Sequence, residues 1–344
     1  MNEIHNHAAW PARLHRVLRA LTLSLAVVGT AGAHAQASPI TADKGGSYPN
    51  RPIRFVVPYA AGGNGDVVAR LVATRLSAQL GQQVFIDNRA GVGGNLGAEM
   101  AARAAPDGYT LFLGTNTHAI NMSLYEKPGF DFAKDFTPIS LVSSAPLVLI
   151  THPAVEARST PELISLAKSR PGALNYATGG SGSSAHIIME LFKTTAGVDI
   201  VHVPYKGVAQ AATDLIAGQV QVMFNSTSTA MDQVRAGRVK ALGVSSAQRT
   251  PLAPGVPTIA EAGFPGFEAT IWQGIFVPTG TPAPIVDRLH RELALLLTSE
   301  DVKKQMFQQG VVPTGSTPSQ FQTFVKSEVA KWGKVVKASG AKVD

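Results

Sequence analysis

The feature that most limits the fold of this chain is a junction that recurs at least five times. At each junction an apolar strand segment ends in a short loop rich in Gly, Ser, Thr or Asn, and a segment with helical spacing follows. The strand segments end near residues 57, 113, 177, 203 and 224. Strands that alternate with helices in this way predict an α/β fold with a mostly parallel sheet covered on both faces.

The chain is long enough for two such units, because its 344 residues exceed what one simple core usually holds. The alternating pattern stops near residue 150 and returns near residue 174. We predict a first lobe from residues 51–151 plus 269–344 and a second lobe from residues 152–268. The helices expected at 284–297 and 317–337 have no strands of their own, so they should pack on the first lobe.

Two crossings are expected between the lobes. The apolar runs Ile139–Val142 and Leu147–Ile150, with Pro146 between them, look like separate strands that leave the first lobe. The segment at 264–277 looks irregular and would form the return crossing.

Residues 1–35 are typical of a signal peptide. Arg13, Arg16 and Arg19 precede a short apolar run at 21–28, and Ala33-His34-Ala35 is a small-x-small cleavage pattern. The run is shorter than the roughly 20 residues that a membrane span needs, which disfavours a membrane anchor, the alternative interpretation. We therefore predict a periplasmic protein whose residues 36–50 form a flexible leader.

Charge and cysteine content exclude several classes of protein. The chain has no cysteine, which excludes a disulfide scaffold, a cysteine nucleophile and a thiolate metal site. Without residues 1–35, 27 basic and 22 acidic residues remain, so the formal net charge falls from +7 to +5. No basic run or stripe is present, so nucleic acid is not an expected partner.

The repeated loops suggest how a ligand would be held. Helix N-termini carry unpaired N–H groups and partial positive charge, and small loop residues let an anion approach the backbone. In open parallel sheets these loops gather at the carboxyl edge. Two facing sets would bind a carboxylate in a cleft between the lobes with neutral donors alone, and ordinary turns are the alternative for any single loop.

Individual residues leave alternatives open. Asp66 could cap its helix, orient its loop or meet a positive group of the ligand. The hydroxyl groups of Ser181, Ser183 and Ser184 could cap a helix or donate to a carboxylate. Tyr59 and Tyr205 could face the cleft or the core.

Other chemistries fit less well. The stretch at 61–66 lacks the Lys-Ser/Thr ending of a nucleotide-binding P-loop, and Gly91–Gly97 misses the dinucleotide spacing by one residue. Ser181 with His186 invites a serine-hydrolase interpretation, but the sequence around them is not the G-x-S-x-G elbow. The histidines are scattered without the spacing of a metal site. We expect no catalytic residues, no cofactor and no metal.

An ordered set of motifs resembles a known family. The run Tyr48-Pro-x-Arg-Pro-Ile-Arg-Phe-Val-Val-Pro-Tyr-Ala-Ala-Gly-Gly-x-x-Asp66, then Pro106-Asp-Gly-Tyr-Thr-Leu111, His202-Val-Pro-Tyr-Lys-Gly207 and Trp272-x-Gly274 resemble the Bug-type receptors of tripartite tricarboxylate transporters. The similarity extends over residues 48–340.

The resemblance implies a two-lobed, type II (Venus-flytrap) periplasmic binding protein that closes on a small di-, tri- or aromatic carboxylate. It implies inner-membrane transporter subunits as partners, and fold analogy suggests a monomer. A periplasmic sensor that works with a membrane kinase, a secreted hydrolase and an orphan binding protein are the rival functions. The loops implied to bind the ligand contain Tyr59, Ala61, Gly62, Gly63, Asp66, Thr115, Asn116, Thr178, Ser181, Ser183, Ser184, Tyr205, Asn225 and Ser226.

One departure from the family pattern bears on the ligand. The family often has Asp where this chain has Asn225. A neutral amide pairs poorly with an ammonium group, so we expect a plain carboxylate in preference to an amino acid.

Overall fold

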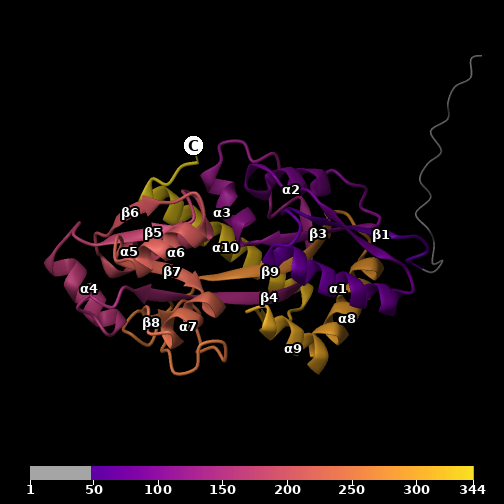
Figure 1. Cartoon of the computed structure of the whole chain (residues 1–344). Helices are drawn as coiled ribbons and strands as arrows, with labels where there is room; N and C mark the ends of the chain where they lie inside the picture. Colours follow the sequence, from indigo (N-terminus) through magenta and orange to yellow (C-terminus); the bar gives the residue numbers. More distant parts are fainter. Residues whose placement is uncertain (1–47, 344) are drawn as a thin grey trace, which may run out of the picture. The chain divides into compact units, whose positions relative to one another are not determined.

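The computed structural model describes residues 48–343 (Figure 1). The predicted signal peptide, and the leader up to residue 47, lie outside the described residues. None of the helices within residues 48–343 has both the length and the apolar character needed to cross a bilayer.

Strands and helices alternate through most of this region. The strands are β1 (Ile53–Val57), β2 (Val84–Asn88), β3 (Thr110–Thr115), β4 (Phe136–Thr151), β5 (Asn175–Thr178), β6 (Val201–Pro204), β7 (Val222–Ser226), β8 (Lys240–Val244), β9 (Thr270–Pro278) and β10 (Val312–Pro313). The helices are α1 (Asn64–Leu80), the 3₁₀ turn η1 (Val92–Gly94), α2 (Asn95–Ala102), α3 (Asn116–Leu124), α4 (Thr160–Ser169), α5 (Ser184–Ala196), α6 (Val208–Ile216), α7 (Thr227–Arg235), α8 (Ala283–Thr298), α9 (Glu300–Gln308) and α10 (Pro318–Ser339).

The strands form one sheet with the order β2-β1-β3-β9-β4-β7-β5-β6, to which β10 and β8 add by pairing with β4. β1 pairs in parallel with β2 and β3, and β5 pairs in parallel with β6 and β7. The pairs that involve β4 or β9 are antiparallel. The sheet is therefore mixed, which corrects the expectation of a mostly parallel one. The alternation of strand and helix fails to predict this, because β4 and β9 are crossing strands.

β4 joins the two halves of the sheet. It was expected as two strands separated by Pro146, but it is a single strand of 16 residues. Up to Pro146, which pairs with Thr270, it lies beside β9, and from Leu147, which pairs with Ser226, it lies beside β7. We call the strands on the β1 side the first half-sheet and those on the β7 side the second half-sheet.

The expectation of an irregular segment at 264–277 was wrong for most of its length. β9 is a nine-residue strand between β3 and β4, and the two long strands run side by side in Figure 1. Eight of its nine residues are buried, so its sequence lacks the alternation that identifies a half-exposed strand. Gly274 is required there, because a Cβ would collide with the ring of Phe321 on α10.

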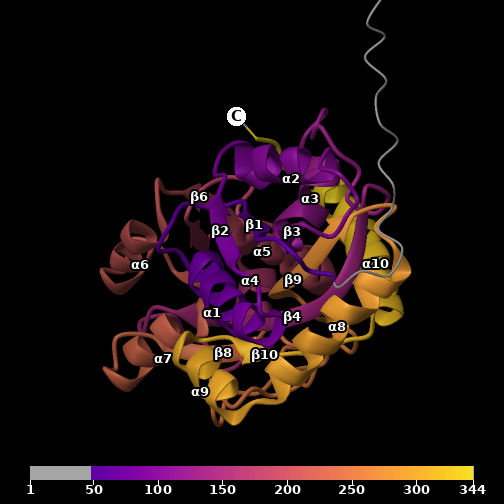
Figure 2. The same ribbon diagram turned by 90° about the vertical axis from the view of Figure 1, so that its right-hand side faces the viewer.

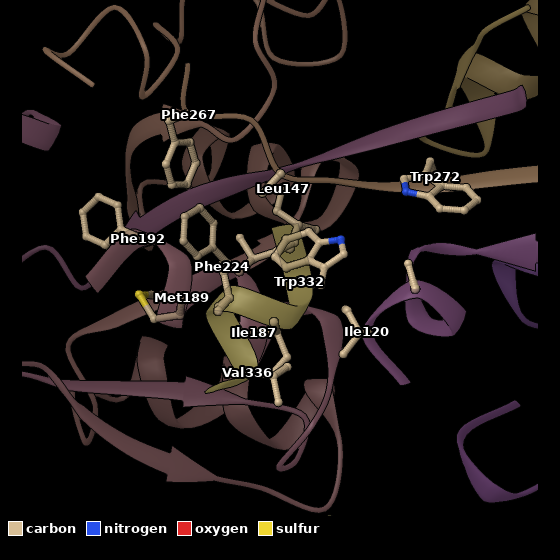
Figure 3. Close-up of a cluster of buried hydrophobic side chains, with 14 of the residues drawn as sticks. Ile120, Leu147, Ile187, Met189, Phe192, Phe224, Phe267, Trp272, Trp332 and Val336 are labelled. Atoms are coloured by element: carbon tan, nitrogen blue, oxygen red, sulfur yellow. The ribbon is translucent and has the colours of Figure 1, made fainter. Parts of the chain in front are cut away.

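The C-terminal helices pack more widely than expected. α8 packs against α1 and β4, as predicted for the first lobe (Figure 2). The predicted capping box of α10 is confirmed, with Thr317 Oγ1 accepting from the Gln320 N–H. α10 contacts α3 and β4 but also α5, so it reaches the helices of the second half-sheet. Figure 3 shows Trp332 and Val336 of α10 close to Ile187 of α5 and Ile120 of α3 within one buried apolar cluster.

Candidate functional site

A hollow of about 570 Å³ lies where the two half-sheets meet. Three helices begin at its wall: the first residues of α1, α3 and α7 all line it. Its floor includes Ala145–Leu147 of β4 and Ile271 and Gln273 of β9. The lining residues are Tyr59, Ala60, Ala61, Gly63, Asn64, Gly65, Thr115, Asn116, Thr117, Ala145, Pro146, Leu147, Ser226, Thr227, Ser228, Ile271, Gln273, Gln309 and Gly310.

Asp66 holds the loop that connects β1 to α1. Its Oδ2 accepts hydrogen bonds from the Gly62 N–H (2.9 Å) and from Arg70 Nε (2.8 Å), and its Oδ1 accepts from Asn88 Nδ2 (2.8 Å). Burial alone would raise the pKa of Asp66, but these bonds outweigh it and leave the pKa below its ordinary value. Of the three roles considered for Asp66, orientation of the loop is the one that its contacts support.

Tyr59 links the same loop to the end of β3. Its hydroxyl group lies 2.6 Å from Thr115 Oγ1, and burial raises the pKa of Tyr59. The Thr115 N–H donates to His118 Nδ1 (3.0 Å) at the first turn of α3. Burial lowers the pKa of His118 to about 4, so the ring is neutral near pH 7 and can accept this bond. The order of the α3 N-terminus therefore depends on a neutral imidazole.

A contact between Asn116 and Ser184 joins a helix of the first half-sheet to a helix of the second. Asn116 Nδ2 lies 3.1 Å from Ser184 Oγ, which joins the start of α3 to the start of α5. Asn116 is fully buried and lines the hollow, whereas Ser184 reaches the hollow only through this contact.

Four predicted residues of the second half-sheet have other partners or face solvent. Thr178 Oγ1 lies 2.7 Å from His202 Nε2, and Ser183 Oγ accepts from the His186 N–H as the N-cap of α5. The Tyr205 hydroxyl donates to Asp214 Oδ2 (2.8 Å), and Ser181 is exposed. None of these four residues lines the hollow.

Asn225 and Ser226 end β7 beside the hollow. The Ser226 N–H donates to Asn225 Oδ1 (2.8 Å), which fixes the orientation of the Asn225 amide. Asn225 Nδ2 is thus a buried donor with no partner among residues 48–343. Ser226 lines the hollow, whereas Asn225, the preceding residue of β7, does not.

The structure brings six predicted residues together on the lining: Tyr59, Ala61, Gly63, Thr115, Asn116 and Ser226. Gly62 belongs to the β1–α1 loop that Asp66 holds, and neither of these two residues lines the hollow. Sequence reasoning missed the residues of β4, β9 and the α9–β10 turn, Gln273 and Gln309 among them. One signal was available, because Gln273 is the middle residue of the Trp272-x-Gly274 motif.

Among residues 48–343 the lining is uncharged, and it combines apolar side chains with a smaller polar surface. It contains no Lys, Arg, His, Asp or Glu, and its donors are backbone N–H groups, amides and hydroxyl groups. Three helix N-termini give the hollow partial positive charge without a cationic side chain. Such a site can bind an anion through neutral donors.

Two histidines that the sequence left scattered are adjacent. The rings of His186 and His202 stack with centroids 4.1 Å apart. His186 Nδ1 accepts from the Gly182 N–H, so it does not donate to a carboxylate as the histidine of a catalytic triad does. Among residues 48–343, no group of three or more His, Cys, Asp or Glu side chains could hold a metal ion.

Comparisons with known proteins agree on one class of protein. A family model for the tripartite tricarboxylate transporter family receptor matches residues 68–341. BugT of Bordetella pertussis is 38% identical over 329 residues, which covers 94% of this chain and 99% of BugT.

Two solved structures are similar over most of the chain. One is an R. palustris protein with adipate, 39% identical, covering 86% of this chain and 100% of that protein with a TM-score of 0.71. The other is MatC from Rhodopseudomonas palustris with bound malate, 35% identical, covering 84% and 100% with a TM-score of 0.68.

Proposed function

The chain belongs to the tripartite tricarboxylate transporter receptor family, and from this premise we propose that it captures a small organic carboxylate in the hollow between its half-sheets. The resemblance found in the sequence motifs is confirmed, as is the two-lobed fold of a solute-binding protein. The observation that carries the proposal is the convergence of three helix N-termini on one uncharged hollow.

Three further observations support this function. The hollow offers neutral donors suited to a carboxylate, and its lining contains no acidic residue that would repel one. Asn225 Nδ2 is an additional buried donor. The solved relatives include one with adipate and one with malate, both dicarboxylates.

The ligand would contact lining residues of both half-sheets. We assign this role to Tyr59, Ala61, Gly63, Thr115, Asn116 and Ser226 and add Gln273, while Gly62 and Asp66 shape the first loop. Asn225 would approach from behind Ser226. Thr178, Ser181, Ser183, Ser184 and Tyr205 would take part only if the second lobe moves toward the hollow on binding.

The wider biological role follows from the family. Family members are periplasmic binding proteins, and the proposed signal peptide at residues 1–35 would bring this chain to the periplasm. There it would act as a monomer and present its loaded form to the inner-membrane transporter subunits. The family is one of solute-binding receptors; we propose that this chain also has no enzymatic activity. The lobes would comprise residues 51–151 plus 269–344 and residues 152–268.

Calorimetric titration tests the proposal. The chain from Gln36 onward, unfolded and refolded to remove bound ligand, would be titrated with succinate, malate, adipate, citrate, benzoate, glutamate and aspartate. A tight, stoichiometric response to at least one carboxylate is expected. No response from a folded sample, or turnover of the ligand, contradicts the proposal.

A blocking variant locates the site. Ser228 is exposed at the rim of the hollow, so Ser228→Trp should fill it and weaken binding at least about 10-fold while the fold is kept. Ser319→Trp places the same ring on an exposed position of α10 and should bind normally. Equal affinity in both variants would place the ligand elsewhere.

A further inference from the structure

The carboxamide of Gln273 has a fixed orientation. The backbone carbonyl oxygen of Gln309 can only accept a hydrogen bond. The Asn64 side chain must therefore turn its Nδ2 toward this oxygen, which lies 3.1 Å away. Asn64 Oδ1 then faces Gln273 and can only accept, so Gln273 must turn Nε2 toward Asn64 (2.9 Å). We call these two hydrogen bonds, from Gln273 to Asn64 and from Asn64 to Gln309, the orienting relay. The relay uses Gln273 Nε2 and leaves Gln273 Oε1 available to accept another hydrogen bond.

The free oxygen is buried and unpaired. Gln273 is 4% exposed and lines the hollow, and its Oε1 has no hydrogen-bond partner within residues 48–343. Its direct neighbours in the sheet are Thr115 on β3 and Ser143 on β4. Thr115 Oγ1 is engaged with Tyr59, and Ser143 Oγ makes no hydrogen bond to any described residue. A buried acceptor without a donor is unfavourable, and a donor that the ligand brings against the Gln273 side chain would satisfy it.

The charge of the hollow determines what kind of donor fits. An ammonium group would lie near three helix N-termini without an acidic side chain in the lining to balance it. A hydroxyl group donates one hydrogen bond and carries no charge. Neutral donors elsewhere in the hollow remain available for the carboxylate.

We propose that Gln273 is a specificity-determining residue that accepts a hydrogen bond from a hydroxyl group of the ligand, so that the preferred ligands are hydroxycarboxylates. The inference rests on the proposed function and narrows its ligand class. A ligand without the hydroxyl group leaves Gln273 Oε1 unpaired in the closed complex, and this loss should cost about 10- to 100-fold in affinity.

Matched pairs of ligands test the proposal by calorimetric titration. Malate against succinate, citrate against tricarballylate, and 4-hydroxybenzoate against benzoate each differ by one hydroxyl group. In at least one pair the hydroxylated ligand should bind about 10- to 100-fold more tightly. Equal or weaker binding of the hydroxylated member in every pair that binds overturns this inference but leaves the proposed function intact. Absence of binding in all three pairs counts against the proposed function itself.

Variants connect the preference to one oxygen. Gln273→Met keeps the approximate length of the side chain and removes its acceptor, so the preference should fall to less than about 3-fold, mainly through weaker binding of the hydroxylated ligand. Gln79→Met is the matched control, because Gln79 Oε1 is also buried and unpaired but lies near the opposite end of α1 from the hollow. Gln79→Met should prefer the hydroxylated ligand as strongly as the natural chain does. A preference retained in Gln273→Met contradicts the assignment.

A second variant leaves Gln273 in place. Asn64→Ala removes the group that orients the carboxamide, which becomes free to present either Nε2 or Oε1. The preference for the hydroxyl group should fall by several-fold in a sample with unchanged circular dichroism. This variant keeps the proposal testable if Gln273→Met does not fold, and an unchanged preference would refute the orienting relay.

Discussion

The indole Nε1 of Trp272 on β9 lies 2.7 Å from Oε2 of Glu328 on α10, and both side chains are buried. The indole Nε1 of Trp332 donates to the same oxygen at 2.8 Å. Lys331 pairs with the other carboxylate oxygen. One carboxylate thus fastens α10 to the strand that forms the floor of the hollow.

Removal of this carboxylate should destabilise the fold. Glu328→Ala leaves two buried indole N–H groups without acceptors, each costing about 1–3 kcal/mol, so the free energy of unfolding should fall by about 2–6 kcal/mol. Urea denaturation followed by tryptophan fluorescence measures this. Glu126→Ala, at an exposed glutamate, should change stability by less than about 0.5 kcal/mol. A small effect of Glu328→Ala would mean that the indole bonds contribute little.

Asp66 should matter for both stability and binding. Asp66→Ala deprives the Gly62 N–H, Arg70 and Asn88 of their shared acceptor, and we expect a loss of about 2–4 kcal/mol in stability. Carboxylate affinity should fall at least about 10-fold, because the β1–α1 loop loses its shape. Asp301→Ala, which removes an exposed partner of Arg75, is the control and should affect neither quantity. Normal binding by Asp66→Ala would show that the loop holds its shape without this carboxylate.

His118 should make the protein sensitive to acid. Its pKa lies at about 4 in the folded state and near 6.5 in the unfolded chain, so the unfolded state takes up the proton first as pH falls. The contribution of His118 to the free energy of unfolding is therefore fully present above pH 6.5. It is lost as pH falls toward 4 and amounts to on the order of 3 kcal/mol.

His118→Gln isolates this contribution. Gln at the third helical position can accept from the Thr115 N–H as in an ordinary capping box, but it does not titrate. The variant should lose less stability than the natural chain between pH 7 and pH 5 in urea denaturation. Parallel losses in the two proteins would show that other groups control the acid response.

Asn225→Asp tests the expected preference for a plain carboxylate. The substitution replaces a buried donor with a negative charge, so succinate or malate should bind about 10-fold or more weakly. Aspartate should lose less affinity than succinate, because its ammonium group can approach the new carboxylate. Calorimetric titration with succinate and with aspartate gives the ratio of the two affinities. If this ratio is the same in Asn225→Asp and in the natural chain, Asn225 does not select the ligand.

The sequence predicted the alternating elements well. The strand ends predicted near residues 57, 113, 177, 203 and 224 fall within two residues of the ends of β1, β3, β5, β6 and β7, because each of these strands combines an apolar run with a loop and a following helix. The crossing strands were not predicted correctly. β9 is buried on both faces and contains Gly274, whose fit under Phe321 is a tertiary contact that local pattern does not reveal. Pro146 suggested a break where β4 continues through it.

The candidate site was predicted in part for the same reason. Loops at strand ends were identifiable, and Tyr59, Thr115 and Ser226, which the family resemblance implied as ligand contacts, line the hollow. Gln273 lies within a strand that the sequence did not indicate. Its free oxygen depends on Asn64 and Gln309, which are distant in the sequence, and only folding brings the three together.

β4 has a mechanical consequence for a protein of this kind. The strand is shared by both half-sheets, and the exchange of partners from β9 to β7 occurs between Pro146 and Leu147. Proline has no N–H group, so at this point there is no ladder donor to lose. A bend of the chain here would change the angle between the half-sheets, while Thr227 Oγ1 donates to the Pro146 carbonyl group and the Leu147 N–H donates to Ser245 Oγ. Pro146 and Leu147 also line the hollow, so a ligand bound there would lie against the junction of the two half-sheets.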